Sequence, residues 1–290
     1  MSYDFFLTAI LQGLGFTALG IGIFLSLRIF NIPDITTDGS YTLGAAVTAV
    51  LIKSGMNPFA AMFFAVASGM LAGSATGIIH TRLKIHPLLS GILVMTALYS
   101  INLLVMGRSN IPLINTNNIF SLFAFSNATV AGVFIFSITV FILIVLVTWL
   151  LKTDFGIAMR ATGNSEAMVR SMGVNTSHMK IIGLAIANGL TALSGYLLTQ
   201  YQGFADINMG IGIVVSGLGA VMIGEALLHK WLQKGIIYSV LAVVAGSVLF
   251  RLIIAAALSF GLNPNYLKLI TALIVLIIVA AGSSKKQFER

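Results

Sequence analysis

The sequence predicts an all-α protein that crosses a membrane many times, and three observations support this. Charged side chains make up only 8% of the 290 residues. Hydrophobic ones make up 58%, and the mean hydropathy is +1.02. A soluble domain carries about 25% charged residues, because water must solvate its surface. Third, apolar runs recur that approach the roughly 20 residues needed to cross a bilayer core.

Nine such runs are expected to form transmembrane helices, with eight or ten as the alternatives. In chain order they are 5–28, 40–54, 58–82, 88–107, 128–151, 181–201, 210–228, 235–259 and 266–282. The second run is short and contains glycine, and the seventh is interrupted by Gly217, Gly219 and Gly224. Frequent glycine within lipid-spanning runs indicates close helix packing and broken helices. We therefore expect one transmembrane domain over residues 1–290.

The basic residues predict how these helices are oriented. If the loop 152–180 is cytoplasmic, alternation of nine spans places all but four of the 16 Lys and Arg residues on that side. The four exceptions are Lys53, Arg108, Arg251 and Lys268. The bias predicts a multi-pass cell-membrane protein with its N-terminus outside and its C-terminus in the cytoplasm. Because the basic residues lie in short connections, we expect no nucleic acid partner.

Two parts of the chain resemble each other. Gly69 and the pair His86–Pro87 align with Gly246 and the pair Asn263–Pro264 at a constant offset of 177 residues. We expect repeat units of about 5–107 and 181–282, separated by the span 128–151 and the loop 152–180. Five spans separate the starts of the two units, so the halves would be inverted, as in many transporters. Chance similarity, or an ancient duplication without mechanistic meaning, is the alternative.

Small residues recur every four positions on three of the predicted helices. These ridges are Ser40, Gly44 and Thr48 in the second span, Ala65, Gly69, Gly73 and Gly77 in the third, and Gly212, Ser216, Ala220 and Gly224 in the seventh. Such ridges let helix backbones approach closely in lipid. We expect these three helices to form a tightly packed centre around a pathway, although packing alone would also explain the ridges.

The segment 27–45 carries the first candidate site. Pro33 ends the first span, and Thr37 or Asp38 is expected to cap a helix that begins near Gly39. A second interpretation is that this helix N-terminus faces an internal cavity, where its free N–H groups would bind a carboxylate. The candidate pathway residues are Asp34, Asp38, Ser40, Thr42 and Ser216. Together they would suit a zwitterion such as an amino acid.

The loop 152–180 is the longest strongly polar stretch and carries the second candidate site. A short amphipathic helix is expected from Ser165 to Met172. Ser165 or Asn164 would cap its start, and Gly173 suits the left-handed position that ends a helix. A partner protein could grip such a helix. An ordinary basic loop is the alternative.

At this segment a resemblance becomes specific. The run GIAMRATGNSEAMVRSMGV resembles the cytoplasmic coupling loop of ATP-binding-cassette importer permeases in the branched-chain amino acid and ribose permease family. DITTDGSYTLGA is similar to the aspartate-and-glycine signature at that family's second helix, and GIGIVVSGLGAVMIGEAL resembles its glycine-rich later span. The whole chain most resembles a subgroup associated with tryptophan or tyrosine uptake. One departure is that four residues, rather than three, separate Glu166-Ala167-Met168 from Gly173.

The resemblance implies a permease subunit that moves a small solute, such as an amino acid, by alternating access and is not itself an enzyme. Expected partners are cytoplasmic ATPase subunits, an external solute-binding protein and a second permease copy. The residues expected to couple to the ATPase are Gly163, Asn164, Ser165, Glu166, Arg170 and Gly173. No G-x-x-x-x-G-K-[ST] phosphate loop is present, so ATP would be used by another chain. No cofactor or metal is expected.

Two ionisable residues, Glu225 and Arg251, lie within predicted spans, where a transporter coupled to an ion would need such groups. We expect them to lie near opposite faces of the membrane, unpaired with each other, with each side chain extending toward the nearer surface. The alternative to an ATP-driven permease is a stand-alone ion-coupled transporter or channel with inverted repeats. It would need a buried ionisable coupling site, and the spans offer few other candidates.

Overall fold

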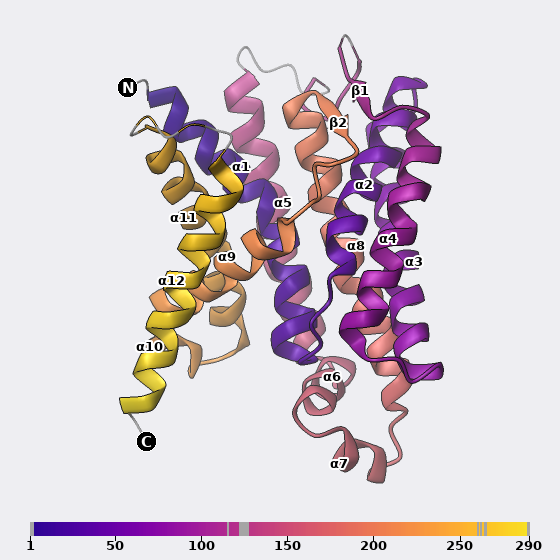
Figure 1. Cartoon of the computed structure of the whole chain (residues 1–290), viewed down its shortest axis with the longest axis vertical. Coiled ribbons are helices and arrows are strands. Elements are labelled where there is room, and N and C mark those ends of the chain that lie inside the picture. Colours follow the sequence, from indigo (N-terminus) through magenta and orange to yellow (C-terminus); the bar gives the residue numbers. More distant parts are fainter. Residues whose placement is uncertain are drawn as a thin grey trace.

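The computed structural model describes residues 3–114, 116–121, 128–259, 261, 263 and 266–288. Long helices form a bundle with a small sheet at one end and two short helices at the other (Figure 1). The elements are α1 (Tyr3–Ile23), the π-helix η1 (Phe24–Ile29), α2 (Thr36–Lys53), α3 (Pro58–Arg82), α4 (Pro87–Met106), β1 (Asn110–Pro112), α5 (Ala128–Lys152), α6 (Asp154–Asn164), α7 (Glu166–Ser171), α8 (Thr176–Gln202), β2 (Phe204–Asp206), α9 (Ile213–Leu227), α10 (His229–Leu232), α11 (Ile236–Ser259) and α12 (Leu267–Phe288).

Six stretches of helix are long and apolar enough to cross a bilayer. They are Phe5–Ile29, Pro58–Arg82, Pro87–Met106, Thr129–Lys152, Thr176–Gln202 and Ile236–Ser259, and two shorter apolar helices are Ile213–Leu227 and Leu267–Ala280. The remaining long helix, α2, has a polar first half but is buried over most of its length by α3, α4 and α8. Each predicted span has a helix in the structure, so the all-α polytopic fold is confirmed.

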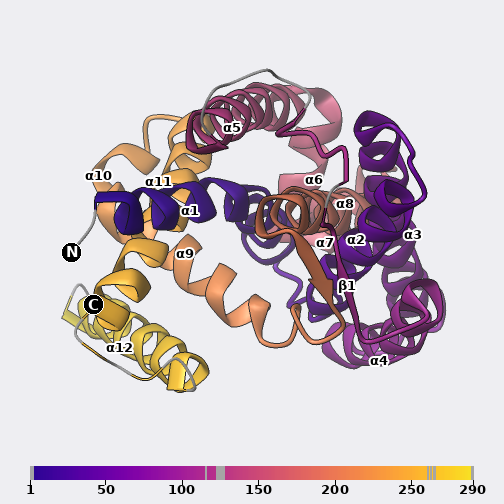
Figure 2. The ribbon, with the colours of Figure 1, turned by 90° about the horizontal axis from the view of Figure 1, so that it is seen from above.

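The helix α8 is the centre of one part of the bundle, where it packs against α1, α2 and α3 (Figure 2). A methyl group added to Gly44 of α2 would overlap the backbone of Ala192, and one added to Gly73 of α3 would overlap that of Leu184. The predicted small-residue ridges of α2 and α3 are therefore close-packing faces, and both meet α8.

The predicted grouping of spans two, three and seven is wrong, because the small-residue ridge of span seven does not pack with spans two and three. The seventh span is α9, and its Gly224 packs against the backbone of Ala242 on α11 instead. Its Gly217 packs on Ile23 at the end of α1. A ridge of small residues identifies a close-packed face but not the helix that meets it, which is why the sequence did not reveal α8 and α11 as the partners.

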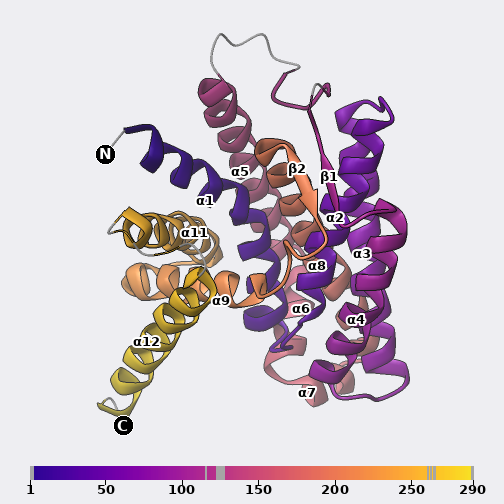
Figure 3. The same cartoon turned by 45° about the horizontal axis from the view of Figure 1, so that its top comes forward.

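Two of the bundle's helices begin in its interior rather than at its ends. After η1 the chain runs extended through Pro33 and then turns into α2, while after β2 it descends from the opposite end to start α9 (Figures 1 and 3). Proline lacks an N–H donor, and its ring disfavours a helical conformation at the residue before it, so the helix of the first span does not continue through Pro33. Gly212, which precedes α9, has φ +81°, a backbone conformation that favours glycine.

The small sheet joins the two connections at the end where α1 begins. Strands β1 and β2 pair antiparallel, with Asn110 opposite Asp206 and Pro112 opposite Phe204 (Figure 3). The Asn110 amide also donates to the Asp206 carboxylate, at 3.1 Å. This pairing ties the segment after α4 to the segment that leads into α9.

The α3–α8 contact can be tested by replacing Gly73 with alanine. The new methyl group would meet the Leu184 backbone, so we expect a loss of about 1–3 kcal/mol in the free energy of unfolding. The matched control is Gly132→Ala on α5, where the methyl group would lie 3.3 Å from the flexible Leu11 side chain. Thermal unfolding of the detergent-solubilised variants measures the difference, and equal melting temperatures would contradict this packing.

Candidate functional site

The first site residues surround Asp34, at the point where α2 begins. Its Oδ1 accepts a hydrogen bond from the Thr36 backbone N–H at 2.9 Å, and its Oδ2 accepts one from the Asn188 side-chain amide at 2.7 Å. The Asn188 Oδ1 in turn accepts from the Ser40 hydroxyl at 2.7 Å. All these side chains are buried. A buried carboxylate is costly unless hydrogen-bonded, and here the start of α2 and an amide from α8 supply those bonds.

The predicted capping of this helix needs correction. The helix begins at Thr36 rather than near Gly39. The side chain that accepts a hydrogen bond at its start is that of Asp34, and neither Thr37 nor Asp38 caps this helix. The Thr37 hydroxyl instead donates to the Asp34 carbonyl oxygen at 3.1 Å. The physical reason is that Asp34 accepts a free N–H of the first turn, so the helix starts earlier than the capping pattern indicated.

Asp38 also caps a helix, but a different one from that expected. Its carboxylate accepts hydrogen bonds from the backbone N–H groups of Gly212, at 2.8 Å, and Val214, at 2.9 Å. These groups belong to the start of α9, where the helix dipole favours a negative charge. The Asp38 backbone carbonyl also packs directly against Gly210. We call this contact between Asp38 and residues 210–214 the interior clasp.

The structure brings four of the five candidate pathway residues together. Asp34, Asp38 and Ser40 make the contacts just described, and the Thr42 hydroxyl donates to the Asp38 carbonyl oxygen at 3.2 Å. In this conformation these side chains are buried and bonded within the subunit, so they hold helix ends together rather than line an open passage. The fifth candidate, Ser216, lies apart from them, on a narrow cavity between α1, α9 and α11.

Sequence reasoning missed Asn188, which links Asp34 to Ser40. Its side chain is fully buried in the middle of α8, and its amide also donates to the Leu184 carbonyl oxygen at 3.0 Å. The available signal was a primary amide within the apolar run 181–201. A polar side chain inside a membrane span needs a bonding partner, which marks such a position for attention.

The coupling segment, which we define as residues 152–180, contains the expected short helix as α7 (Glu166–Ser171) and a second helix, α6, before it. Two helices, α6 and α7, meet at Ser165, whose backbone is extended. Thr153 begins α6 by accepting a hydrogen bond from the Gly156 N–H at 3.3 Å. Asn164 is the last residue of α6 and Ser165 makes no side-chain cap, so neither caps α7 as predicted. Gly173 has φ +84° and ends α7 in the left-handed conformation, as predicted.

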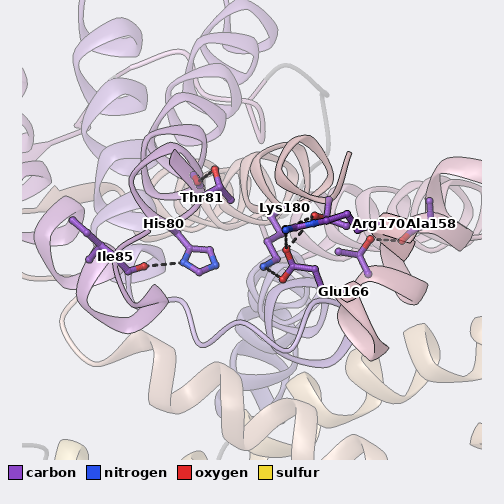
Figure 4. Close-up of polar contacts among 10 residues, drawn as sticks. His80, Thr81, Ile85, Ala158, Glu166, Arg170 and Lys180 are labelled. Carbon is purple, nitrogen blue, oxygen red and sulfur yellow. Dashed lines mark hydrogen bonds and ion pairs between the residues drawn. The ribbon is translucent and has the colours of Figure 1, made fainter. Parts of the chain in front are cut away.

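Glu166 joins α7 to the first turns of α8 (Figure 4). Its Oε1 accepts from Arg170 at 2.7 Å and from the Thr176 hydroxyl at 3.1 Å, while its Oε2 accepts from Lys180 at 2.5 Å. The hydrogen bond from Lys180 is the main cause that lowers the pKa of this carboxyl below its ordinary value, with Thr176 and Arg170 adding to the effect. Glu166 and Arg170 therefore hold the shape of the coupling segment.

Gly163 places the coupling segment against the end of the first span. A side chain there would overlap the backbone of Ile29 in η1 and of Phe30 beyond it. In η1, Arg28 forms an ion pair with Glu225 near the end of α9. Glu225 thus has a partner and does not simply extend to the membrane surface, although, as expected, it does not pair with Arg251. The contacts run from α6 through η1 to α9.

Apolar side chains of the coupling segment remain exposed. Ile157 is 49% exposed, Met168 58% and Met172 70%, at the end of the molecule away from the sheet (Figure 1). Methionine adapts its shape to a partner surface, and grouped exposed apolar residues mark protein contacts. Sequence reasoning named the polar residues of this segment and missed these two methionines, whose spacing of four was the available signal.

The fold and these contacts define a class of protein. Apolar helices span the bundle, two further helices begin in its interior, and a separate pair of short helices lies at one end. Helices that begin inside the membrane are tolerated where they line a cavity or are buried in protein, and they are frequent in transporters. The chain is therefore a polytopic α-helical protein of the transporter class.

Comparison with known proteins identifies the family. The family described as "Branched-chain amino acid transport system / permease component" matches residues 5–280, and the chain belongs to it. The chain is 39% identical over 272 residues to the tyrosine transport system permease protein of Clostridioides difficile, covering 94% of this chain and 89% of that one. It is 25% identical over 259 residues to the ribose import permease protein of Bacillus subtilis, covering 87% and 76%.

A third relative is the autoinducer 2 import system permease protein of Yersinia pestis, 26% identical over 214 residues, or 71% of this chain and 58% of that one. No solved structure matches the chain significantly. The protein is thus a multi-pass membrane permease subunit of an ATP-binding-cassette importer, as the resemblance implied.

The interior clasp can be tested through Asp38→Asn. The amide keeps one acceptor oxygen but loses the charge and one hydrogen bond to α9, so we expect the start of α9 to separate from α2 more often, by about tenfold. Because the chain has no cysteine, the labelling rate of an introduced Ile213→Cys reports this opening. The matched control is Asp206→Asn, which alters a carboxylate at the sheet. An unchanged labelling rate in Asp38→Asn would argue against the clasp.

The Glu166 contacts predict a dependence on pH. A carboxyl with a lowered folded-state pKa stabilises the fold above its unfolded-state pKa, and that contribution disappears as the pH falls through the folded-state value. We expect hydrogen exchange of residues 166–180, corrected for intrinsic rates, to rise as the pH falls below about 4.5. Glu166→Gln should show the faster exchange already at pH 7, with little further change on acidification. Identical profiles for the two proteins would exclude this role.

Proposed function

We propose that this permease moves an amino acid across the cell membrane by alternating access, driven by ATPase subunits that bind the coupling segment. The observation that carries the proposal is the geometry of α6 and α7. They leave the bundle at one end, Glu166 ties them to α8, and they present exposed Ile157, Met168 and Met172. The relative named as a tyrosine transport system permease supports an amino acid as the solute.

Coupling would follow the contacts from α6 to α9. A displacement of α6 acts on Ile29 through Gly163, and the Arg28–Glu225 ion pair connects η1 to α9. The other end of α9 is held by Asp38. A partner that moves α6 would therefore bias the position of a helix whose start lies in the bundle interior.

The inverted repeat remains a proposal, and three observations support it. Shifting α3 (58–82) by 177 residues gives 235–259, and α11 spans Ile236–Ser259. Asp34 accepts a hydrogen bond from the N–H two residues later, at 2.9 Å, and Asp206 does the same with Asn208, also at 2.9 Å. The segments that lead into α2 and α9 enter the bundle from opposite ends (Figure 1). Such an arrangement fits halves related by inversion.

A second copy of the chain would complete the pathway. Residues 207–212 approach α9 without helical structure, and Ile211 and Gly212 are exposed. Irregular backbone at membrane depth is tolerated only against protein or a water-filled cavity, not against lipid. We infer that this face lines the pathway between two copies, with the coupling segment in the cytoplasm and the sheet facing an external solute-binding protein.

The ion-coupled alternative receives less support from the described residues. Asp34 and Asp38 are both bonded to helix starts, and Glu225 is paired with Arg28. A coupling ion would have to compete with these contacts. ATP-independent uptake driven by a sodium or proton gradient alone would favour that alternative.

The test replaces the two exposed methionines of the coupling segment. Met168→Glu with Met172→Glu places charges on an apolar surface, so we expect at least a tenfold loss of co-purified ATPase and of ATP-driven amino acid uptake in vesicles. The matched control, Met168→Leu with Met172→Leu, keeps the surface apolar and should retain both. Normal ATPase association in the glutamate variant would refute the proposed docking surface.

A further inference from the structure

We propose that Arg251 is the subsite that binds the carboxylate of the transported solute, within the cavity between α1, α9 and α11. This inference rests on the proposed function, since it assumes that the solute is an amino acid. Arg251 lies inside α11, eight residues before that helix ends at Ser259. The cavity is lined by Phe16, Ser216, Ser247, Phe250 and Arg251, among others.

The guanidinium of Arg251 lies over an aromatic ring rather than beside an acid. Its Cζ is 3.6 Å from the centroid of the Phe16 ring, which in turn stacks on Tyr41 with centroids 5.9 Å apart. The ion pairs found in the described part of the chain involve Arg28, Arg170 and Lys180, not Arg251. The partly exposed cation is therefore held by an aromatic face, without a carboxylate partner among those residues.

An arginine in this position needs a reason. A charged side chain within a membrane span is costly, and a cation–π contact returns only about 0.5–2 kcal/mol. Arginine presents a planar set of donors that matches a carboxylate through two parallel hydrogen bonds. The carboxylate of a bound solute would provide the missing negative charge.

The other cavity residues suit the rest of an amino acid. Phe16 and Phe250 offer aromatic surface for an apolar side chain. The Ser247 hydroxyl donates to the Val243 carbonyl oxygen at 2.9 Å, which leaves its own oxygen as an acceptor for an ammonium group. Cation, hydroxyl and aromatic rings are thus gathered around one space, on three helices.

The cavity is closed in this conformation. It has room for about one water molecule, and Gly217 of α9 packs against Ile23 of α1 at its edge. Admitting a solute would require α9 to move away from α1. The two ends of α9 are those held by Asp38 and by Arg28, so the proposed coupling path ends at the helix that covers the subsite.

The decisive experiment uses the complete importer in vesicles and follows chemical modification of Arg251 by phenylglyoxal, residue by residue, during ATP turnover. The probe is L-tyrosine, or whichever of the twenty standard L-amino acids the wild type accumulates most. We expect the probe to slow modification of Arg251 at least fivefold, while its decarboxylated amine and its carboxamide do not. Exposed Arg82 at the end of α3 serves as the internal control and should be modified equally in all conditions.

Variants give the second readout. Arg251→Gln should lower uptake of the probe at least tenfold while ATPase association is retained, and Arg251→Lys should recover part of the uptake. Arg108→Gln, which removes an exposed cation after α4, is the matched control and should transport normally. If Arg251→Gln fails to assemble, the protection of Arg251 in the wild type alone tests the subsite.

The outcomes separate this inference from the proposed function. ATP-driven uptake with equal protection by the amine, or normal transport by Arg251→Gln, would overturn the subsite and leave the importer intact. Modification of Arg251 that is no faster during ATP turnover than without ATP would mean that the cavity does not open, and would also overturn the subsite. If no standard amino acid enters with ATP, the proposed function fails first and this inference fails with it.

Discussion

The pair of hydrogen bonds that the start of α9 donates to the Asp38 carboxylate is the interaction on which the rest of the architecture depends. A bilayer offers no water to unpaired backbone groups, so a helix that begins inside the bundle must have its first N–H groups satisfied by protein. Asp38 does this for α9, and Asp34 does it for α2. Removing either carboxylate would leave N–H groups at the start of that helix without their acceptor.

The small residues follow from the same constraint. Asp34 reaches Asn188 only because α2 lies close to α8, and that approach requires glycine at position 44. Gly73 brings α3 onto the next turns of α8, and Gly210 lets the backbone before α9 meet the Asp38 carbonyl. The hydrogen bonds of Asp34 and Asp38 therefore depend on the glycine ridges, because closely packed backbones let short polar side chains reach each other.

Local patterns in the sequence predict much of this fold, and contacts across the chain explain what they miss. The runs of apolar residues predict where nine of the helices lie, and Gly173 predicts the left-handed end of α7. The role of Asp38 could not be predicted, because a capping pattern identifies an acceptor but assumes that the helix it caps is its own. In the same way Glu166 was predicted to be a coupling residue, but its hydrogen bond from Lys180 depends on how α7 folds back onto α8.

The polar contacts at the two ends of α9 have free energies in the range needed for a two-state conformational switch. Two hydrogen bonds to the Asp38 carboxylate contribute about 1.5–3 kcal/mol each, and the partly exposed Arg28–Glu225 pair adds about 1 kcal/mol at most. Moving a two-state equilibrium from 1:99 to 99:1 requires about 5.5 kcal/mol. The contacts are therefore strong enough to keep one conformation dominant and weak enough for a partner of ordinary affinity to reverse it. A fully apolar interface of the same length would resist such movement, whereas charged contacts at the two ends of one helix can be released and remade as units. This makes α9 the element best placed to change which side of the membrane the interior faces.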